Sequence, residues 1–363
     1  MNSAHELGAL IAALRALQRE PQPLAALATL TRTRGSSFRR PGTRMLILGD
    51  GGVVCELSGG CPQRDIVARA REVIAYAQPR LLQYNAGSSL DVLIEMGCGG
   101  ELEVLIEPLA GAHALDFVDP LADCLDARQD AHLATVFAFD NTVVMPRRML
   151  CRADARRHDD LGDPALSDAI IDALDALPAR RATALRLASR HGIADVLIEP
   201  VTPPHALVVI GSSAAARALL PLAAALGWQT ILVEHDPARL QASELPPAQR
   251  VVCAAPALLR AALPLDAHSS VVVMTHNYEQ DLAYLDALRD APVAYLGTLG
   301  SRERIARMRR GTTLAGLRVH APAGLDIGSE TPEEIALAVI AEIMAVINGR
   351  RGGPLRDNQG AIH

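Results

Sequence analysis

The chain has 363 residues and a formal net charge of −6, a balance that argues against nucleic acid as its main partner. A chain of this length can form two domains, and because only 3% of its residues are aromatic, aliphatic and alanine side chains must fill their cores. No apolar run approaches the roughly eighteen residues of a membrane span, and no secretory signal opens the sequence. A cytoplasmic location without membrane attachment is therefore expected.

The six cysteines are too scattered for a zinc site or a disulfide framework. They stand at positions 55, 61, 98, 124, 151 and 253, with no CxxC pair and no His/Cys cluster. Without an export signal, reduced thiols are expected. Cys61 and Cys98 lie in glycine-rich turns, and the other four are interpreted as structural.

The first half of the chain is predicted to form a mixed α/β domain. Helical spacing of apolar residues predicts helices over 5–19, from about residue 63, within 110–130 and near 164–176. Strand-like runs occur at 25–33, 46–57 (a hairpin), 81–84, 91–95, 101–107, 132–150 (two strands that turn at Asp140-Asn141) and 196–199. No internal repeat is apparent in the chain.

The second half changes rhythm after Pro200, Pro203 and Pro204, which mark the best candidate for a linker. Strands alternate with helical segments and are expected at 206–210, 230–234, 251–253, 270–275 and 294–296. This alternation predicts a Rossmann-like, doubly wound parallel sheet, and the overall fold class is α/β. The expected domains are therefore 1–200 and 205–348, followed by a loose tail over 349–363. Within the second domain, Thr331 as a cap and Pro332 in the first turn predict the start of a helix.

A short turn, Ser58-Gly59-Gly60-Cys61-Pro62, separates a strand-like run from a predicted helix. Gly59 and Gly60 permit a sharp bend and a close approach to a ligand, and Pro62 suits the first helical position. The free N–H groups of a helix start can lower the pKa of a thiol and attract an anion. Two interpretations stay open for Cys61: a reactive thiol at an anion site, or a small buried residue at a helix start.

The loop before this turn gathers cations and hydroxyl donors: Ser36, Ser37, Arg39, Arg40 and Arg44. Arginine can engage phosphate with two parallel hydrogen bonds, and Pro41-Gly42 constrains the loop. The alternative is a solvated charged face. Cys98, between Gly97 and Gly99, either lines the same pocket or belongs to a purely geometric turn.

The first turn of the second half departs from the dinucleotide-binding pattern. In Gly211-Ser212-Ser213, measured against G-x-G-x-x-G/A, only Gly211 and Ala216 fit, and Ser213 takes the position of close approach. An anion site at the helix start is still allowed there, but a pyrophosphate would be crowded. Glu234 stands where an acidic residue would meet a ribose hydroxyl, or it is simply solvated at a strand end.

Two further features follow strands of the second half. His276 lies at the carboxyl end of 271–274, where ligands bind in open parallel sheets, and Asp281 either orients its imidazole or caps a helix. A structural histidine is the alternative. A second glycine turn enters a helix and predicts a phosphate site formed by Gly297, Gly300, Ser301 and Arg302.

Taken together, these motifs resemble the xanthine dehydrogenase accessory proteins, the XdhC/CoxI family. The matching segments occur in the family's order at 34–45, 58–61, 98–100, 274–281, 295–302 and 327–336. The resemblance extends from about residue 29 to about residue 347 and implies a chaperone rather than an enzyme.

Such a protein binds molybdenum cofactor, as molybdopterin or its cytosine dinucleotide form. It acts during sulfuration of the cofactor and delivers it to an apo molybdenum hydroxylase. A sulfur donor of the cysteine desulfurase type and a homodimer are implied as well. A phosphorylated pterin dithiolene would suit the anion-binding turns, with Cys61 as the soft sulfur ligand of the metal.

Two departures from the family pattern keep other hypotheses open. Family members follow Gly-Gly-Cys with an aliphatic residue and a glutamate, whereas this chain has Pro62 and Gln63, and Asp65 keeps an acidic residue further along. Their Gly-Ala-Gly-His turn is replaced by Gly211-Ser212-Ser213-Ala214. One alternative is a nucleotide-dependent oxidoreductase that uses the second domain. Another is a scaffold or regulatory protein that has lost cofactor binding.

Overall fold

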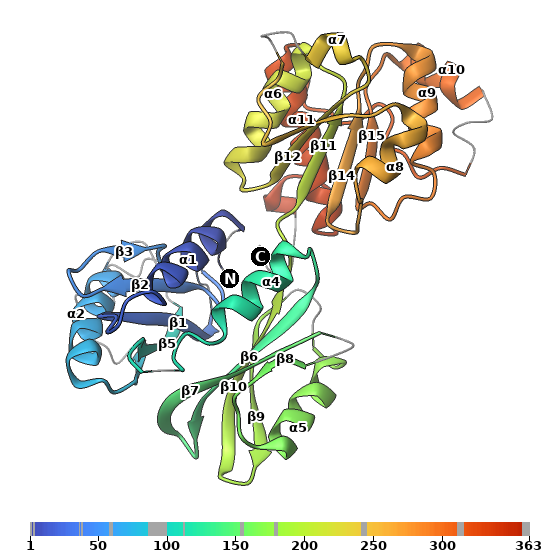
Figure 1. Cartoon of the computed structure of the whole chain (residues 1–363). Helices are drawn as coiled ribbons and strands as arrows, with labels where there is room; N and C mark the ends of the chain where they lie inside the picture. Colours follow the sequence, from blue (N-terminus) through green and yellow to red (C-terminus); the bar gives the residue numbers. More distant parts are fainter. Residues whose placement is uncertain are drawn as a thin grey trace. The chain divides into compact units, whose positions relative to one another are not determined.

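The structure is a computed structural model that describes residues 2, 4–35, 37, 39–57, 61–85, 100–111, 113–152, 156–177, 181–240, 245–310 and 316–357. The chain forms two compact units, Met1–Pro203 and Pro204–His363 (Figure 1). The first unit contains antiparallel sheets with helices and the second a parallel sheet, as the fold class predicts. Among the described residues, no helix is long and apolar enough to span a bilayer.

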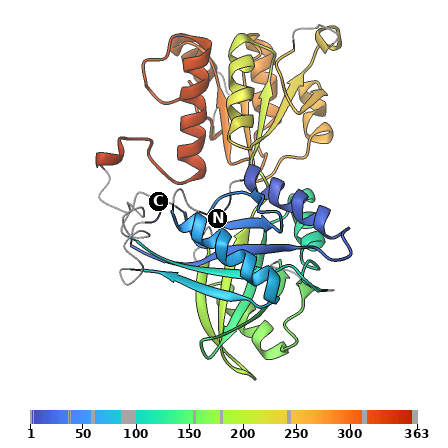
Figure 2. The ribbon, with the colours of Figure 1, turned by 90° about the vertical axis from the view of Figure 1, so that its left-hand side faces the viewer.

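The first unit begins with helix α1 (Ala4–Leu17) and a five-stranded antiparallel sheet. The strands are β1 (Ala25–Arg34), β2 (Arg44–Leu48), β3 (Val53–Val54), β4 (Arg80–Tyr84) and β5 (Glu101–Pro108), in the order β3-β2-β1-β5-β4. Helix α2 (Cys61–Tyr76) lies along one face of this sheet (Figure 2). Its buried residues Ile66, Ala70 and Val73 recur at helical spacing, and they pack on Ala28 and Leu30 of β1.

A second antiparallel sheet follows in the same unit. Its strands are β6 (Ala131–Phe139), β7 (Thr142–Cys151), β8 (Arg156–Asp159), β9 (Thr183–Ser189) and β10 (Gly192–Val201), in the order β8-β7-β6-β10-β9. Helix α4 (Val118–Asp126) precedes it and helix α5 (Pro164–Leu174) covers one face. The predicted turn at Asp140-Asn141 is present, with both residues at positive φ, as a tight hairpin requires.

Several expectations for this unit need correction. The helix expected within 110–130 is confined to α4, because residues 113–117 form turns. Strands β8 and β9 were not predicted. The two sheets share one strand order, so the expectation of no internal repeat is wrong at the level of topology. The strand expected at 91–95 lies outside the described residues.

The second unit holds a five-stranded parallel sheet. Its strands are β11 (Ala206–Ile210), β12 (Gln229–Glu234), β13 (Arg250–Cys253), β14 (Ser269–Val273) and β15 (Tyr295–Thr298), in the order β13-β12-β11-β14-β15. Strands β11, β12 and β13 follow one another toward one edge of the sheet, and β14 and β15 are then added on the other side of β11. In open parallel sheets this reversal places a ligand crevice at the carboxyl ends of β11 and β14.

Helices cover both faces of the parallel sheet (Figure 1). Helices α6 (Ala214–Ala225) and α11 (Pro332–Ile347) lie side by side on one face. Helices α8 (Leu259–Ala262), α9 (Tyr278–Ala287) and α10 (Arg302–Arg310) cover the other face of the sheet. Three further short helical elements are α7 (Pro237–Leu240), η1 (Pro256–Leu258) and η3 (Leu355–Asp357). The predicted start of α11 is confirmed, since Thr331 and Glu334 form a capping box before Pro332.

Candidate functional site

The start of α2 is the first candidate site. Cys61 is the first residue of this 16-residue helix, and the first turn carries no acidic residue. The partial positive charge of the helix start is therefore not neutralised within that turn, which suits an anionic ligand. Four predicted site residues, Ser36, Gly59, Gly60 and Cys98, lie outside the described residues.

The helix behind this turn is held firmly on the sheet. The Tyr84 hydroxyl of β4 donates a hydrogen bond to Asp65 Oδ2 at 2.8 Å, and Arg69 lies 3.5 Å from the same carboxylate. Burial, together with the bond to Asp65, raises the pKa of Tyr84 well above its usual value, so the hydroxyl keeps its proton. Asp65 thus fastens α2 to β4.

The predicted arginine cluster is divided by the fold. Arg39 is half-buried and makes a two-bond ion pair with Glu6 of α1, with nitrogen–oxygen distances of 2.7 and 3.1 Å. The Ser37 hydroxyl donates to the Arg39 carbonyl at 2.7 Å, which shapes the loop. Arg40 is exposed at the loop surface. Of the three arginines, Arg40 is the exposed one, whereas Arg39 is half-buried and Arg44 is buried.

Arg44 does not lie on the loop as expected. It is the first residue of β2, only 5% exposed, and its Nη2 donates to Glu199 Oε2 of β10 at 2.8 Å. Burial disfavours its charge, but the neighbouring Glu199 outweighs burial and raises the pKa of Arg44. The guanidinium is committed to a carboxylate inside the unit, so a role in phosphate binding is not supported.

The second candidate site is the carboxyl edge of the parallel sheet, beginning with Gly211 after β11. Gly211 has a φ of +107°, and a Cβ there would lie 2.7 Å from the Met274 carbonyl oxygen. Glycine is required at this position by the neighbouring strand end. Ser213 is turned inward: its hydroxyl accepts from Ala216 N at 3.2 Å and lies 3.3 Å from the Met274 sulfur. Ser213 therefore caps α6. This cap is compatible with the anion site predicted at the same helix start.

Glu234, at the end of β12, is buried and fully engaged within the unit. It accepts hydrogen bonds from Ser212 Oγ at 2.8 Å and from the backbone N–H groups of His235 and Asp236 at 2.9 and 3.2 Å. The His235 ring lies 3.0 Å away. A ribose hydroxyl would have to displace Ser212, which argues against a dinucleotide bound in the usual way.

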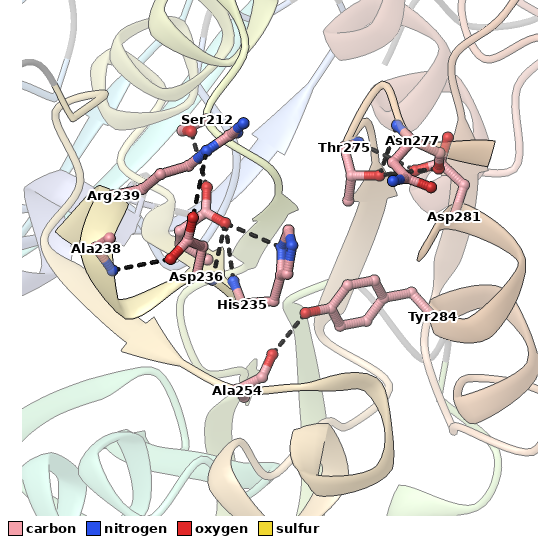
Figure 3. A network of polar contacts seen from close by, with 11 residues as sticks. Ser212, His235, Asp236, Ala238, Arg239, Ala254, Thr275, Asn277, Asp281 and Tyr284 are labelled. Carbon is pink, nitrogen blue, oxygen red and sulfur yellow. Dashed lines mark hydrogen bonds and ion pairs between the residues drawn. The ribbon is translucent and has the colours of Figure 1, made fainter. Parts of the chain in front are cut away.

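The turn after β14 is held by contacts among Thr275, Asn277 and Asp281 (Figure 3). Thr275 donates its N–H and its hydroxyl to Asp281 Oδ1 at 3.0 and 2.6 Å, and Asn277 caps α9. Asp281 also pairs with Arg304 of α10 at 2.5 Å. Asp281 therefore fixes the turn, and among the described contacts it makes none to the imidazole. His276 is exposed, with a left-handed φ of +62°.

The second glycine turn is shorter than predicted. Gly297 lies inside β15, where a Cβ would meet the Tyr295 ring at 2.6 Å, so it is a packing residue. Gly300 and Ser301 do form the turn before α10, and Ser301 Oγ accepts from Arg304 N at 3.2 Å. Arg302 is exposed at the helix start. Together with α6 and α9, α10 brings a third helix start to this edge of the sheet.

A polar cluster that the sequence analysis missed joins α11 to the loop after residue 319. Glu342 accepts from the Tyr295 hydroxyl at 2.6 Å and from Gly324 N at 2.8 Å, and it lies 3.0 Å from His320 Nδ1. The Tyr295 and His320 rings are stacked at 4.4 Å. The one available signal was a glutamate on an otherwise apolar helix, Glu342 within 335–347.

This cluster predicts a loss of stability in acid. Burial raises the pKa of Glu342, but the hydrogen bonds from Tyr295, Gly324 and His320 outweigh it, so the pKa lies below its ordinary value of 4.5. The stabilisation is present above the unfolded value and disappears as the pH falls through the folded one. Thermal unfolding between about pH 7 and about pH 3 should show the stability advantage over Glu342→Gln shrinking. If the stability difference between the natural chain and Glu342→Gln stays constant over this pH range, the prediction is wrong.

Comparison with known proteins assigns the chain to a family. A family model described as the XdhC Rossmann domain matches residues 207–343, and one described as the XdhC and CoxI family matches residues 18–85. A Bacillus subtilis protein, described as a probable subunit of xanthine dehydrogenase, is 27% identical over 90% of this chain and 94% of its own length. The molybdenum cofactor insertion chaperone PaoD of Escherichia coli is 25% identical over 89% and 83%.

A solved structure extends this similarity to the fold. A crystal structure described as a xanthine dehydrogenase from Bacillus halodurans superimposes with a TM-score of 0.74 at 25% identity. The match covers 94% of this chain and 96% of the other. The two family models and the relatives match both halves of the chain. The chain therefore belongs to the XdhC and CoxI family.

Proposed function

We propose that this protein is a molybdenum cofactor-binding chaperone. It binds the cofactor, supports its sulfuration, and delivers it to an apo molybdenum hydroxylase such as a xanthine dehydrogenase. In this proposal it works as a cytoplasmic homodimer with a sulfur donor of the cysteine desulfurase type. The observation that carries the proposal is the match, along nearly the whole chain, to a relative named as a molybdenum cofactor insertion chaperone.

The described residues fit a phosphorylated, sulfur-rich ligand. The start of α2 has no acidic residue in its first turn and begins with Cys61, whose sulfur suits a soft metal, and Arg40 is an exposed cation on the loop between β1 and β2. The metal itself is held by the cofactor's dithiolene, and the role of the protein is to bind and orient that group.

The carboxyl edge of the parallel sheet is proposed as a separate anion site, which can take a phosphate or nucleotide group. The starts of α6, α9 and α10 reach this edge, and Ser212, His276 and Arg302 stand beside them. The buried, satisfied Glu234 makes the competing hypothesis, a nucleotide-dependent oxidoreductase, the weaker one. Pterin bound in the cytosine dinucleotide form would support a nucleotide site at this edge.

Replacement of Cys61 tests the proposal. The protein is purified from cells that make molybdenum cofactor, bound pterin is measured by fluorescence after oxidation, and molybdenum by elemental analysis. Cys61→Ala is expected to lower both at least about tenfold, because the soft sulfur ligand is lost. The matched control is Cys253→Ala, since Cys253 is an exposed thiol of β13 remote in sequence from α2.

The outcomes separate the hypotheses. If neither pterin nor molybdenum co-purifies with the natural chain, and added cofactor does not bind, the chaperone proposal fails and the scaffold hypothesis stands. Tight binding of NADH with turnover would favour the oxidoreductase instead. If Cys61→Ala and Cys253→Ala lose equal amounts of pterin and molybdenum, Cys61 is not part of the site, and the chaperone proposal itself still holds.

A further inference from the structure

The first unit contains repeated sequence. Three short segments of its first part recur in the same order in its second part. The pairs are Leu27-Ala28-Thr29 and Leu133-Ala134-Thr135, Arg44-Met45-Leu46 and Arg148-Met149-Leu150, and Val104-Leu105-Ile106-Glu107-Pro108 and Val196-Leu197-Ile198-Glu199-Pro200. An identical pentapeptide and two identical tripeptides in one order favour a common origin over chance.

The secondary structure repeats in the same way. Within the described residues, both parts run helix, three strands, helix, two strands: α1, β1–β3, α2, β4–β5 and then α4, β6–β8, α5, β9–β10. In both sheets the first strand lies in the centre, and the strand orders correspond one to one. We call residues 4–108 the first copy and residues 118–201 the second copy.

The repeated residues occupy equivalent places in the two sheets. Thr29 lies opposite Arg44 on one side and Leu105 on the other. Thr135 lies opposite Arg148 and Leu197 in the same way. Because a one-residue slip would turn every side chain to the other face, this agreement in register is strong evidence of equivalence.

The two copies meet through this face. Leu27, Leu46, Leu133 and Leu150 share one apolar core with α1 and α4. Two buried ion pairs cross between the copies: Arg44 of the first copy pairs with Glu199 of the second, and Arg148 of the second pairs with Glu107 of the first. All four side chains are between 2% and 6% exposed.

The ion pairs are reciprocal, which is the mark of a two-fold, self-complementary interface. Arg44 corresponds to Arg148 and Glu107 to Glu199, so each copy offers the same arginine and receives the same glutamate. Even the unsatisfied atoms correspond: within the described part of the chain, the Nε groups of Arg44 and Arg148 and the hydroxyls of Thr29 and Thr135 find no hydrogen-bond partner.

We infer that residues 4–201 are two copies of one module, joined in one chain as a pseudo-dimer through a face that fits a second copy of itself. The face is formed by Leu27, Thr29, Arg44, Leu46, Leu105 and Glu107 in the first copy. Its counterpart in the second copy is Leu133, Thr135, Arg148, Leu150, Leu197 and Glu199.

The duplication also shows how the copies diverged. The helix after the third strand begins with Cys61-Pro62 in the first copy, and in the second copy it begins with Pro164 and is capped by Asp163. Asp163 is buried and accepts from Leu166 N at 3.4 Å and from Arg190 N at 3.0 Å. Its carboxylate thus fills the place of an anion at α5. This step rests on the proposed function: the first turn of α2 carries no acidic residue, so in the described residues the first copy has no such carboxylate to compete with an anionic cofactor.

A copy exchange tests the inference in the full chain. Residues 118–201 are replaced by a second copy of residues 4–108, so that Arg44 and Glu107 pair in both directions. The chimera is expected to unfold cooperatively and, with two Cys61 turns, to bind about two pterins per chain where the natural chain binds about one. A folded chimera that binds one pterin would refute the divergence step. A natural chain without pterin would refute the proposed function and leave the duplication standing.

Matched variants of the natural chain keep the inference falsifiable if the chimera does not fold. Glu107→Gln and Glu199→Gln should each lower the melting temperature of the first unit by about 10 °C, because each leaves a buried arginine unpaired. Cys61→Asp, which copies the Asp163 cap, should abolish pterin binding without such a loss. The pseudo-dimer would be overturned if the chimera fails to fold and Glu107→Gln and Glu199→Gln change the melting temperature by unequal amounts. The divergence step would be overturned if Cys61→Asp still binds pterin.

Discussion

Arg44→Met is expected to destabilise the first unit by about 3–5 kcal/mol, because Glu199 would remain as a charge buried between two sheets without its partner. The double variant Arg44→Met with Glu199→Leu should recover most of this loss and lie within about 1 kcal/mol of the natural chain, since two apolar side chains of similar volume need no pairing. Urea unfolding followed by far-ultraviolet circular dichroism measures both effects.

The second unit supplies an internal control for this measurement. Trp228 is the only tryptophan of the chain, and it is buried in the core of the parallel-sheet unit. Its fluorescence should report the same unfolding midpoint in the natural chain and in the Arg44 variants. If Arg44→Met costs less than about 1 kcal/mol, the pair is solvated and the buried interface described above is wrong.

Gly211→Ala is expected to destabilise the second unit by about 3 kcal/mol. The φ of +107° disfavours any side chain, and the added Cβ would lie 2.7 Å from the Met274 carbonyl oxygen and 2.8 Å from Thr275 Cα. Both contacts are to backbone at the end of β14, so they can be relieved only by moving a central strand away from β11. The Trp228 fluorescence transition in urea measures the loss.

Gly353→Ala is the matched control for this prediction. Gly353 has no left-handed φ, and a Cβ there meets nothing within 4 Å, so the substitution should change stability by no more than about 0.5 kcal/mol. Equal stability of Gly211→Ala and Gly353→Ala would show that the turn after β11 is free to move, and that the crevice at the switch point is not rigid.

Local patterns predicted the second unit well. Short apolar runs bounded by glycine and proline gave all five parallel strands within a few residues, because strands buried on both faces are continuous hydrophobic segments. The start of α11 was predicted from Thr331-Pro332 alone, since a cap residue followed by proline acts through local hydrogen bonds. The family was likewise predicted from short motifs, which occur along this chain in the same order as in the family.

The roles of individual site residues were predicted less well. Arg39, Arg40 and Arg44 are close in sequence, yet they have three different environments, because partners 33 and 155 positions away in sequence, Glu6 and Glu199, bind two of them. Gly297 belongs to a strand rather than a turn for a similar reason: its neighbours include Ala323, which the loop before α11 brings back to β15.

The internal repeat distinguishes features that depend on neighbouring residues from features that depend on residues far apart in the chain. Most strands and helices and the parallel sheet can be predicted from the chain alone, because each depends on residues a few positions apart. Which arginines are exposed and which are buried in ion pairs depends on strands far apart in the chain, so the folded structure was needed to establish it. The folded structure also made the repeat evident. The copies keep few identical residues, but those residues face one another in one register and exchange buried charges across a two-fold interface.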